Sequence, residues 1–562
     1  MPQLVLGPLL RYVGDTEATV WVETDAACEV AVLDHSSRTF EVEGHHYALV
    51  CIKGLTPGTA TEYEVALGEE KVWPPEDHDF PPSLIRTLDP DGVLRVSFGS
   101  CRVAYAHRKP YTLPKDKHPE GREVDALYAL ARRMRSTSPE HWPHLLLMLG
   151  DQVYADEASP KVREFIESRR DPKEPPGYEV ADFEEYVRLY YESWGDTDPS
   201  LRWLLSTVST AMIWDDHDVH DDWNTSDVWL EEMRRKPWWE KRISAGVMSY
   251  WIYQHIGNVE PHHLDDDEMY DRVMNCDGDA GPMLREWSHE VAHEVGGARW
   301  SYMRNLCHTR LVMMDSRGGR VLDPAKRAMV DDEEWRFVKA ATAAGQYDHL
   351  LLGTSLPVVL GPALHNIEAW NEALAGGRWG GAAAKLGEKM RRALDLEHWP
   401  AFHASYRRMC ALLRDVGAGR RGPAPASICV LSGDVHHAYL AQIGFRPQDG
   451  VQSAVWQAVC SPFRNPLNTR EKRTILAGWT RGAGRLTRRL ARGAKVPDPE
   501  VGWRLAHDRP WFNNQVAMLE LEGRSAKFRL EKALPDETGG SRVRIEEVFS
   551  RSIAPNLEFA RP

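Results

Sequence analysis

Residues 147–154, LMLGDQVY, mark the point at which a short apolar run ends in a carboxylate and a phenol. The run HLLLML at 144–149 is unbroken and stops at Gly150, which is typical of a central parallel strand rather than a helix. Asp151 and Tyr154 then follow in the loop at the carboxyl end of this strand. Because open α/β sheets bind ligands at that edge, we expect other strands to deliver polar side chains to the same place.

Three further apolar runs end in the same way. They are RVSFGSCR at 95–102, TAMIWDDHDVHDDWN at 210–224 and ICVLSGDVHHAYL at 428–440. Each brings oxygen, nitrogen or sulfur donors to the predicted sheet edge, and a hydrolytic metal centre needs such donors around its ions. Asp151 and Asp434 each follow a glycine, and His436 lies two residues after Asp434 in a segment that we expect to be extended. Together the four clusters predict a metal site.

The composition is that of a water-soluble protein with more than one domain. The chain has 562 residues, of which 42% are hydrophobic and 27% charged, and its net charge of -14 disfavours nucleic acid as a partner. Eight cysteines are scattered without a CxxC pair, which favours reduced thiols. No apolar run is long enough to cross a bilayer, and the first residues lack the pattern of a signal peptide or a twin-arginine signal. We therefore expect a cytoplasmic protein.

The order of predicted elements divides the chain into a β-rich first part and a longer α/β part. The predicted units are a β-sandwich over 1–88, the end of a proline-rich linker at 89–92, a catalytic domain over 93–535 with a helical insertion at about 225–300, and a tail over 536–562. Tyr63 follows a Leu-x-Pro turn and resembles the tyrosine corner of fibronectin type III and immunoglobulin-like modules. The sandwich is interpreted either as a packed accessory domain or as an interaction module.

The motifs FGSCR, LGDQVYAD, WDDHDVHDDWN, MDSR and SGDVHHA, in this order behind a fibronectin-like module, resemble the PhoD-like alkaline phosphatase family. That resemblance implies a metallophosphoesterase-like αββα sandwich, phosphate ester hydrolysis, and Fe3+ and Ca2+ as cofactors. It also implies that Cys101, Asp151, Tyr154 and Asp434 are iron ligands, with Asp151 and Asp434 also facing calcium. Thiolate and phenolate ligands suit a ferric ion, whereas carboxylates suit calcium. Alternatively, Cys101 is an inert core cysteine and Tyr154 a half-buried core aromatic residue.

The segment WDDHD resembles the family's WDDHE and the GNHE motif of the wider metallophosphoesterases. By this resemblance Asp216 takes the place of a metal-binding asparagine, and His217 is placed to protonate a leaving group. The chain departs from the expected pattern at Asp221 and Asp222, where an additional carboxylate increases the negative charge. Asp222 is a candidate metal ligand; the alternative is that these acids cap a helix.

Two arginines are candidates for binding a phosphate group, because a guanidinium can hold two oxygens at once. Arg102 is a candidate catalytic and substrate-binding residue, and Arg317 is a second substrate-binding candidate, although either can instead pair with an acid of the crevice. Residues 464–495 are rich in arginine and are interpreted as a solvated helix packed on the core, a basic lid or a membrane-surface segment. His437 is expected to be structural.

The sequence thus predicts an enzyme that hydrolyses small phosphate esters with a metal-activated hydroxide. A phosphodiesterase acting on nucleotides or phospholipids is one alternative, and a catalytically inactive phosphate-binding protein is another. Zn2+ or Mn2+ are possible in place of iron. The natural substrate, the metal stoichiometry and the oligomeric state are not determined by the sequence.

Overall fold

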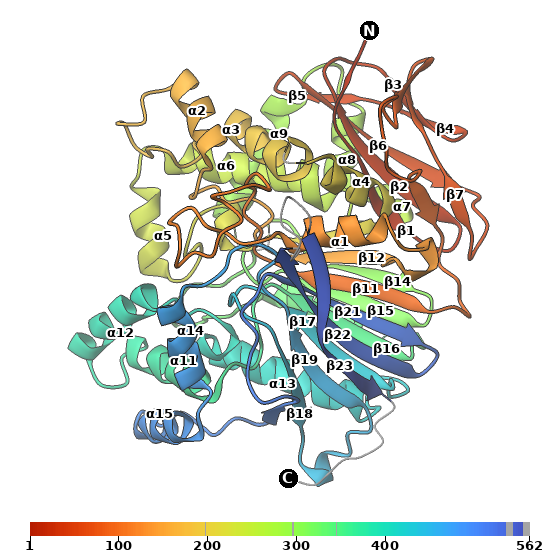
Figure 1. Ribbon diagram of the computed structural model, residues 1–562. Helices are drawn as coiled ribbons and strands as arrows, with labels where there is room; N and C mark the ends of the chain where they lie inside the picture. Colours follow the sequence, from red (N-terminus) through yellow and green to blue (C-terminus); the bar gives the residue numbers. More distant parts are fainter. Residues whose placement is uncertain (197, 295–296, 344, 536–542, 555–562) are drawn as a thin grey trace.

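The computed structural model describes residues 1–196, 198–294, 297–343, 345–535 and 543–554. Figure 1 shows a β-sandwich that contains the N-terminus, packed beside a larger part with two sheets at its centre and helices on both sides. Among the described residues, no helix has the length and apolar character needed to cross a membrane.

Two four-stranded antiparallel sheets form the amino-terminal sandwich. One has the order β1 (Leu4–Val13), β2 (Glu17–Thr24), β6 (His45–Lys53) and β5 (Phe40–Val42), and the other β4 (His35–Arg38), β3 (Glu29–Val32), β8 (Val65–Leu67) and β9 (Glu70–Trp73). A short pair, β7 (Ala60–Glu62) with β10 (Leu84–Arg86), closes the domain. Alternate residues such as Val20, Val22 and Val50 point into a core shared by the two sheets. The predicted β-sandwich is therefore confirmed.

This sandwich is packed firmly on the rest of the chain. The buried Arg11 guanidinium donates to the main-chain oxygens of Tyr253 and Gln254 at 2.6 and 2.7 Å. His45 lies between two carboxylates, 3.0 Å from Glu23 and 2.9 Å from Glu184. Burial alone acts to lower the pKa of His45, but the hydrogen bonds to these carboxylates raise it to about 9. A domain anchored by buried polar contacts is more consistent with a packed accessory domain than with a freely exposed module.

The tyrosine-corner interpretation of Tyr63 is wrong. Its hydroxyl does not return to the local backbone but donates to the main-chain oxygen of Ser206, 2.6 Å away at the end of helix α4 (Pro199–Thr207). Tyr63 is buried, so the hydroxyl must have a partner, and the adjacent domain supplies one. The residue fastens the sandwich to its neighbour.

The first sheet of the larger part has the order β13-β12-β11-β21-β22-β23. Strands β11 (Leu94–Gly99), β12 (Leu145–Leu149) and β13 (Ser209–Ile213) are parallel, and β12 is fully buried between its two neighbours, as the apolar run predicted. Antiparallel strands β21 (Gln515–Glu522), β22 (Ser525–Pro535) and β23 (Val543–Ala554) complete the sheet. Since β23 pairs with β22, part of the expected tail over 536–562 belongs to this sheet; residues 536–542 and 555–562 lie outside the described residues.

The second sheet has the order β14-β15-β16-β17-β19-β18-β20. Its strands are β14 (Tyr302–Leu306), β15 (Thr309–Met314), β16 (His349–Thr354), β17 (Ser427–Ser432), β18 (Tyr439–Gly444), β19 (Ala454–Val459) and β20 (Gly502–Leu505). Strands β15, β16, β17 and β19 are parallel. Apolar residues from both sheets, including Phe98, Leu147, Leu351 and Leu431, share one buried core, so the two sheets face each other. The expected αββα sandwich is confirmed.

Helices cover the outer faces of both sheets (Figure 1). The first group is α1 (Ala126–Met134), α2 (Pro160–Arg169), α3 (Phe183–Tyr191) and α4 (Pro199–Thr207), followed in the insertion by α5 (Asp227–Arg234), α6 (Trp239–Ser249), the π-helix η4 (Tyr250–His255), α7 (Pro261–Leu264), α8 (Glu268–Met274) and α9 (Gly281–His293). The second group is α10 (Asp332–Ala341), α11 (Pro362–Ala375), α12 (Gly381–Ala393), α13 (His403–Gly417), α14 (Thr469–Gly478) and α15 (Arg481–Gly493). The basic segment thus forms two helices, separated just after Gly478, and α15 packs against α11.

Candidate metal centre

The carboxyl ends of parallel strands from both sheets meet at one place. Ser100 and Cys101 follow β11, and Gly433 and Asp434 follow β17 of the opposite sheet. The main-chain N–H of Asp434 donates to Ser100 Oγ at 2.9 Å, which joins the two sheets. A Cβ at position 433 would lie 2.0 Å from that oxygen, so only glycine permits this close approach.

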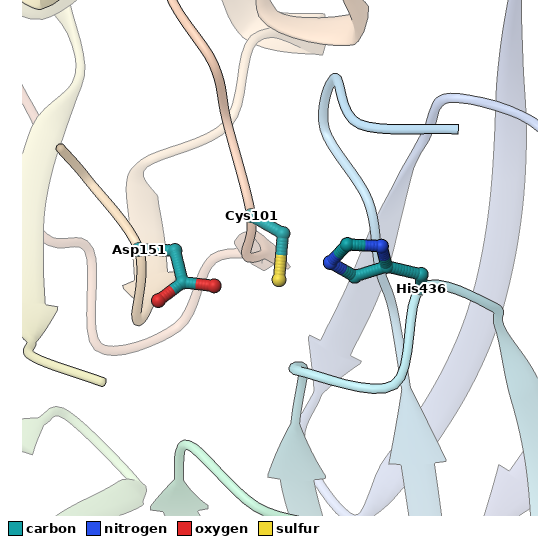
Figure 2. A group of neighbouring side chains, drawn as sticks. All are labelled: Cys101, Asp151 and His436. Carbon is teal, nitrogen blue, oxygen red and sulfur yellow. The ribbon is translucent and has the colours of Figure 1, made fainter. Parts of the chain in front are cut away.

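Cys101, Asp151 and His436 form the first group of donors, with candidate ligand atoms all within 4.8 Å of one another. Figure 2 shows the thiol of Cys101 between the carboxylate and the imidazole. Burial, together with the charges of Asp151 and Asp434, raises the pKa of Cys101 well above its ordinary value. A thiolate therefore needs a cation at this position. The structure thus brings together three of the residues that the sequence placed after the strands, Cys101, Asp151 and His436.

Tyr154 lies beside this first group. Its buried hydroxyl donates to Asp151 Oδ2 at 3.3 Å and accepts a hydrogen bond from Asn465 Nδ2 at the same distance. The phenol thus reaches the predicted site, three residues after the strand-end carboxylate. Its role as an iron ligand stays a prediction.

Two further groups of candidate metal ligands lie next to the first group. Asp151, Asp216 and His217 form one, and Asp215, Asp216 and Asp434 form the other. Asp151 belongs to two of the three groups, and so does Asp216, so neighbouring groups share a carboxylate. Shared carboxylates suit a centre in which one ligand bridges two ions. Asp215 was not predicted as a site residue, although it lies in the quoted WDDHD motif.

The donor set fits metal ions because several buried carboxylate oxygens have no hydrogen-bond partner. Such oxygens belong to Asp151, Asp215, Asp216 and Asp222. Burial raises the pKa of Asp151 and of Asp215 well above the ordinary value, and neighbouring acids add to the effect. Unpaired buried carboxylates are strongly unfavourable, and a divalent or trivalent cation compensates for both their charge and their missing partners.

The backbone at the donor residues is unusual. Cys101, Asp151, Asp434 and His436 all have positive φ, at 57°, 56°, 66° and 49°. This left-handed region is unfavourable for residues other than glycine, by about 1–2 kcal/mol each. Strain of this kind is typical of functional sites, where the surrounding fold holds side chains in a required direction.

His217 is held in a defined orientation. Its Nδ1 lies 2.9 Å from both carboxylate oxygens of Asp156, and its ring stacks on Tyr154 with 4.5 Å between ring centres. Since Nδ1 faces Asp156, Nε2 is the nitrogen that remains for chemistry, and it lies 3.9 Å from Asp221 Oδ1. Asp156 was not predicted, although it is the last residue of the motif LGDQVYAD.

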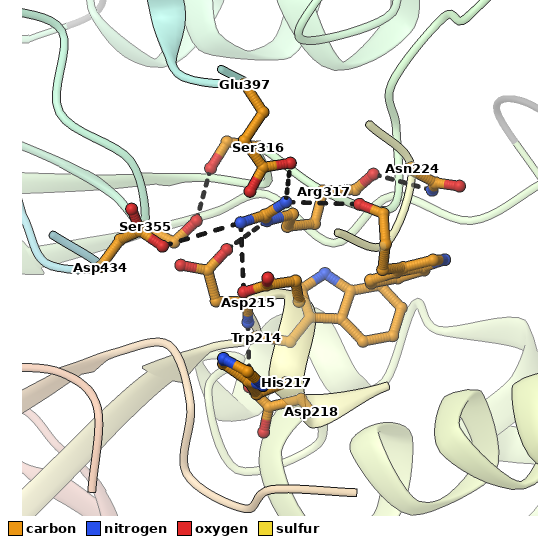
Figure 3. Close-up of polar contacts among 12 residues, drawn as sticks. Trp214, Asp215, His217, Asp218, Asn224, Ser316, Arg317, Ser355, Glu397 and Asp434 are labelled. Atoms are coloured by element: carbon orange, nitrogen blue, oxygen red, sulfur yellow. Dashed lines mark hydrogen bonds and ion pairs between the residues drawn. The ribbon is translucent and has the colours of Figure 1, made fainter. Parts of the chain in front are cut away.

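Arg317 lies among the acids of the centre (Figure 3). Its Nε pairs with Asp215, and its Nη1 donates to Glu397 Oε2 at 2.6 Å. Nη2 lies 3.2 Å from Asp216 and 3.7 Å from Asp434 but has no hydrogen-bond partner. The guanidinium thus supplies positive charge at the predicted place, and one of its nitrogens is available to an anion. Substrate binding by Arg317 stays a prediction.

The position of Arg102 does not fit the predicted catalytic or phosphate-binding role. Its guanidinium is fully buried, pairs with Asp125 at 2.8 Å and donates to the main-chain oxygen of Ser193 at 2.8 Å. Asp125 caps helix α1, so Arg102 fixes the start of that helix. The side chain of a residue that follows a strand can turn either to the crevice or into the core, and the sequence does not distinguish the two.

Asp222 lies near the centre but outside the three groups formed by the described residues. Its main-chain N–H donates to Asp216 Oδ2 at 3.1 Å, and its carboxylate lines a cavity of about 1450 Å³ bounded by α11, α12 and residues 494–497. Burial and the nearby Glu397 raise the pKa of Asp222 to about 9. The helix-cap alternative does not hold, because the side chain of Ser226 caps α5.

The segment between α12 and α13 contributes groups that the sequence did not reveal. His398 Nε2 lies 2.8 Å from Asp434 Oδ2, and its Nδ1 lies 2.6 Å from Glu368 Oε1. Burial acts to raise the pKa of Asp434, but the hydrogen bond with His398 more than offsets this and lowers it. The sequence DLEH at 395–398 could have indicated these groups, but the region was interpreted only as helical.

By contrast, His437 is structural as expected: its Nδ1 bonds to the main-chain oxygen of Val435.

The chain was compared with protein families, with curated proteins and with solved structures. Residues 122–275 match the model of the PhoD-like phosphatase family. This segment is similar to PhoD-like phosphatases. The matched segment contains the motifs around Asp151 and His217, whereas Cys101 and Asp434 lie outside it. Residues 1–85 match a domain of unknown function (DUF7800). No curated protein matches the chain significantly.

Two solved structures are similar to this chain at low sequence identity. The structure of PhoD is similar with a TM-score of 0.56 and 12% identity, over 97% of this chain and 89% of that one. Purple acid phosphatase PPD1 from seeds of yellow lupin (Lupinus luteus) has a TM-score of 0.46 and 10% identity, over 98% of this chain and 73% of that one. The likeness to PhoD shows that the two chains share a common fold.

Proposed function

We propose that this protein hydrolyses phosphate esters in a metal-dependent reaction. The observation that carries the proposal is the convergence of Cys101, Asp151, Asp216, Asp434 and His436 at the strand ends, with buried carboxylate oxygens that have no partner. The match of residues 122–275 to the family model supports a phosphatase, and the donor chemistry supports metal ions.

The donors differ in chemistry along the site. Cys101, Asp151 and His436, with Tyr154 beside them, would hold Fe3+, because thiolate and phenolate ligands favour a strongly Lewis-acidic ion. The carboxylates of Asp151, Asp216 and Asp434 would hold Ca2+. When bound, such ions supply Lewis acidity towards a phosphoryl oxygen and lower the pKa of a water molecule. Zn2+ or Mn2+ in the same positions would preserve hydrolysis.

The remaining residues position the substrate and move the proton. Arg317 Nη2 would bind an oxygen of the phosphoryl group and balance the charge that develops on it. His217, oriented by Asp156, would donate a proton from Nε2 to the oxygen of the leaving group. His398 and Glu368 hold the carboxylate of Asp434 in place from the opposite side. Rigid positioning and fixed charges supply most of the rate in phosphoryl transfer.

Phosphodiester hydrolysis is a second candidate, and the cavity beside Asp222 favours it. At about 1450 Å³ the cavity is larger than a simple phosphate monoester requires, and Arg378, Lys385 and Lys389 are among its lining residues. A substrate with a second substituent on phosphorus would extend into it. The same metal centre is able to attack either ester class.

The test compares kcat/KM for a nitrophenyl phosphate monoester and for the corresponding diester, with iron and calcium supplied. Asp434→Ala, which removes one carboxylate of the candidate metal centre, serves as the control. A monoester preference would support an alkaline phosphatase role, and a diester preference would support the second candidate. Turnover of neither ester above the level of Asp434→Ala would contradict both and favour a binding protein.

A further inference from the structure

A second cluster of metal-binding side chains lies in the helical insertion. It comprises Glu240 in the first turn of α6, and His289 and His293 on α9. The two histidines are four residues apart, so they lie one helical turn apart on the same face of α9. None of the three residues belongs to the centre described above.

The distances match those of a small tetrahedral metal site. Glu240 Oε2 lies 3.4 Å from His289 Nε2 and 3.2 Å from His293 Nε2. In a tetrahedral zinc site with bonds of about 2.0–2.1 Å, neighbouring ligand atoms are separated by about 3.3–3.4 Å. Both distances from the carboxylate to an imidazole therefore already have the spacing that such an ion imposes, and the ligand atoms of the three residues all lie within 4.8 Å of one another.

The orientation of the groups favours an ion over a hydrogen bond. Glu240 Oε2 is buried and has no hydrogen-bond partner, although both imidazole nitrogens are close to it. His293 Nδ1 lies 2.8 Å from the main-chain oxygen of His289 and must donate to it. That bond fixes the tautomer in which the neutral ring has its lone pair on Nε2, which faces the carboxylate. A backbone oxygen that orients a histidine in this way is typical of metal ligands.

Charge balance also favours a cation. The rings of His289 and His293 are stacked, with 4.3 Å between their centres and an angle of 20° between their planes. Two protonated rings in this arrangement would repel each other, and Glu240 is the carboxylate that both of them approach. One divalent ion held by two neutral rings and the carboxylate removes this conflict. The C-terminal end of α9, where His293 lies, carries partial negative charge and adds to the attraction.

We propose that Glu240, His289 and His293 form a binding site for Zn2+ or a chemically similar transition-metal ion, with water as the fourth ligand. Two imidazoles and one carboxylate are a typical ligand set for zinc and disfavour calcium and magnesium, which prefer oxygen donors alone. The ion reaches the site from solvent or from the cavity of about 730 Å³ that Glu240 and His289 line. Bound there, it ties the last turn of α9 to the first turn of α6.

A second histidine pair provides a matched control. His262 and His263 are close to Glu260, but they are consecutive residues on the four-residue helix α7. Both are exposed, and no bond to the backbone is found for either ring among the described residues. This group has the same residue types as the proposed site, one glutamate and two histidines, but within the described part of the chain its histidine rings are not oriented by the backbone.

The test measures bound zinc per chain by elemental analysis after dialysis of the full-length protein against buffered Zn2+. We expect His289→Ala/His293→Ala to bind one equivalent less than the wild type, and His262→Ala/His263→Ala to bind the same amount as the wild type. Glu240→Gln is the second variant if the double variant does not fold, as judged by circular dichroism, and it too should lose that equivalent. Phosphate ester hydrolysis should be unchanged, which separates this site from the catalytic centre. Equal zinc content in the wild type and the folded variants would overturn the proposal.

Discussion

Asp156→Asn tests the role of His217 as a proton donor. Asp156 approaches His217 Nδ1 at 2.9 Å with both oxygens, and it also accepts the main-chain N–H of Asp221 at 2.6 Å. Asparagine keeps the size of the side chain but removes the charge that stabilises the protonated ring. The substitution therefore changes the proton donor and leaves the metal ligands in place.

The expected magnitude follows from this contact. A hydrogen bond to a charged group contributes about 1.5–3 kcal/mol, and each 1.36 kcal/mol of barrier changes the rate about tenfold. The 2.9 Å contact is largely shielded from water, with side-chain exposures of 23% for His217 and 9% for Asp156. We therefore expect kcat for an alkyl phosphate to fall about 10- to 100-fold.

The assay compares two leaving groups. An alkyl alcohol needs protonation as it departs, whereas an acidic nitrophenol leaves without it, so Asp156→Asn should have little effect on the nitrophenyl ester. Glu157→Gln is the matched control, because it removes the next carboxylate, which pairs with Arg122 at 2.8 Å. An equal loss for both esters, or no loss for either, would refute the assignment of His217 as the general acid.

Three further predictions concern stability. The carboxylate partners of His45 raise its pKa to about 9 against the effect of burial, so its contribution to stability is complete below pH 6.5 and is lost as the pH rises through 9. Below pH 6.5, His45→Gln should therefore lower the free energy of urea unfolding by about 3 kcal/mol relative to the wild type, and a difference independent of pH would contradict this. Tyr63→Phe leaves a buried main-chain oxygen without its donor and should lower the free energy of unfolding by about 1–2 kcal/mol, whereas Tyr178→Phe, on an exposed side chain, should have almost no effect. Gly433→Ala places a Cβ 2.0 Å from Ser100 Oγ and should destabilise the protein by about 1–3 kcal/mol, with partial recovery when Ser100→Gly is added; a fully stable single variant would show that the sheets can separate here.

The sequence revealed the strands of the fold because their apolar runs are short and end in glycine or acid. LLLML at β12 and SICVLS at β17 are buried on both faces, and such runs are diagnostic of central parallel strands. By contrast, the pairing of β23 with β22 was missed, because its exposed residues alternate with only half-buried ones and give a weak apolar pattern.

The sequence predicted site residues that closely follow strands. It did not predict those that lie in segments between helices. Cys101, Asp151 and Asp434 each follow a strand closely, so local pattern alone places them at a common edge. His398 and Glu397 lie between helices, and only the tertiary fold brings them to Asp434 and Arg317. The sequence likewise did not determine where the Arg102 side chain points, because the position of its partner Asp125 depends on how α1 packs.

The most direct test of the central claim is the metal content and turnover of Asp151→Asn beside the wild type. Asp151 belongs to two of the three donor groups, so neutralising it should remove metal from both. We expect the wild type to retain at least two metal ions per chain after dialysis and to hydrolyse a nitrophenyl phosphate ester, and the folded variant to lose both metal and activity. A folded Asp151→Asn protein with wild-type metal content and turnover would contradict the account.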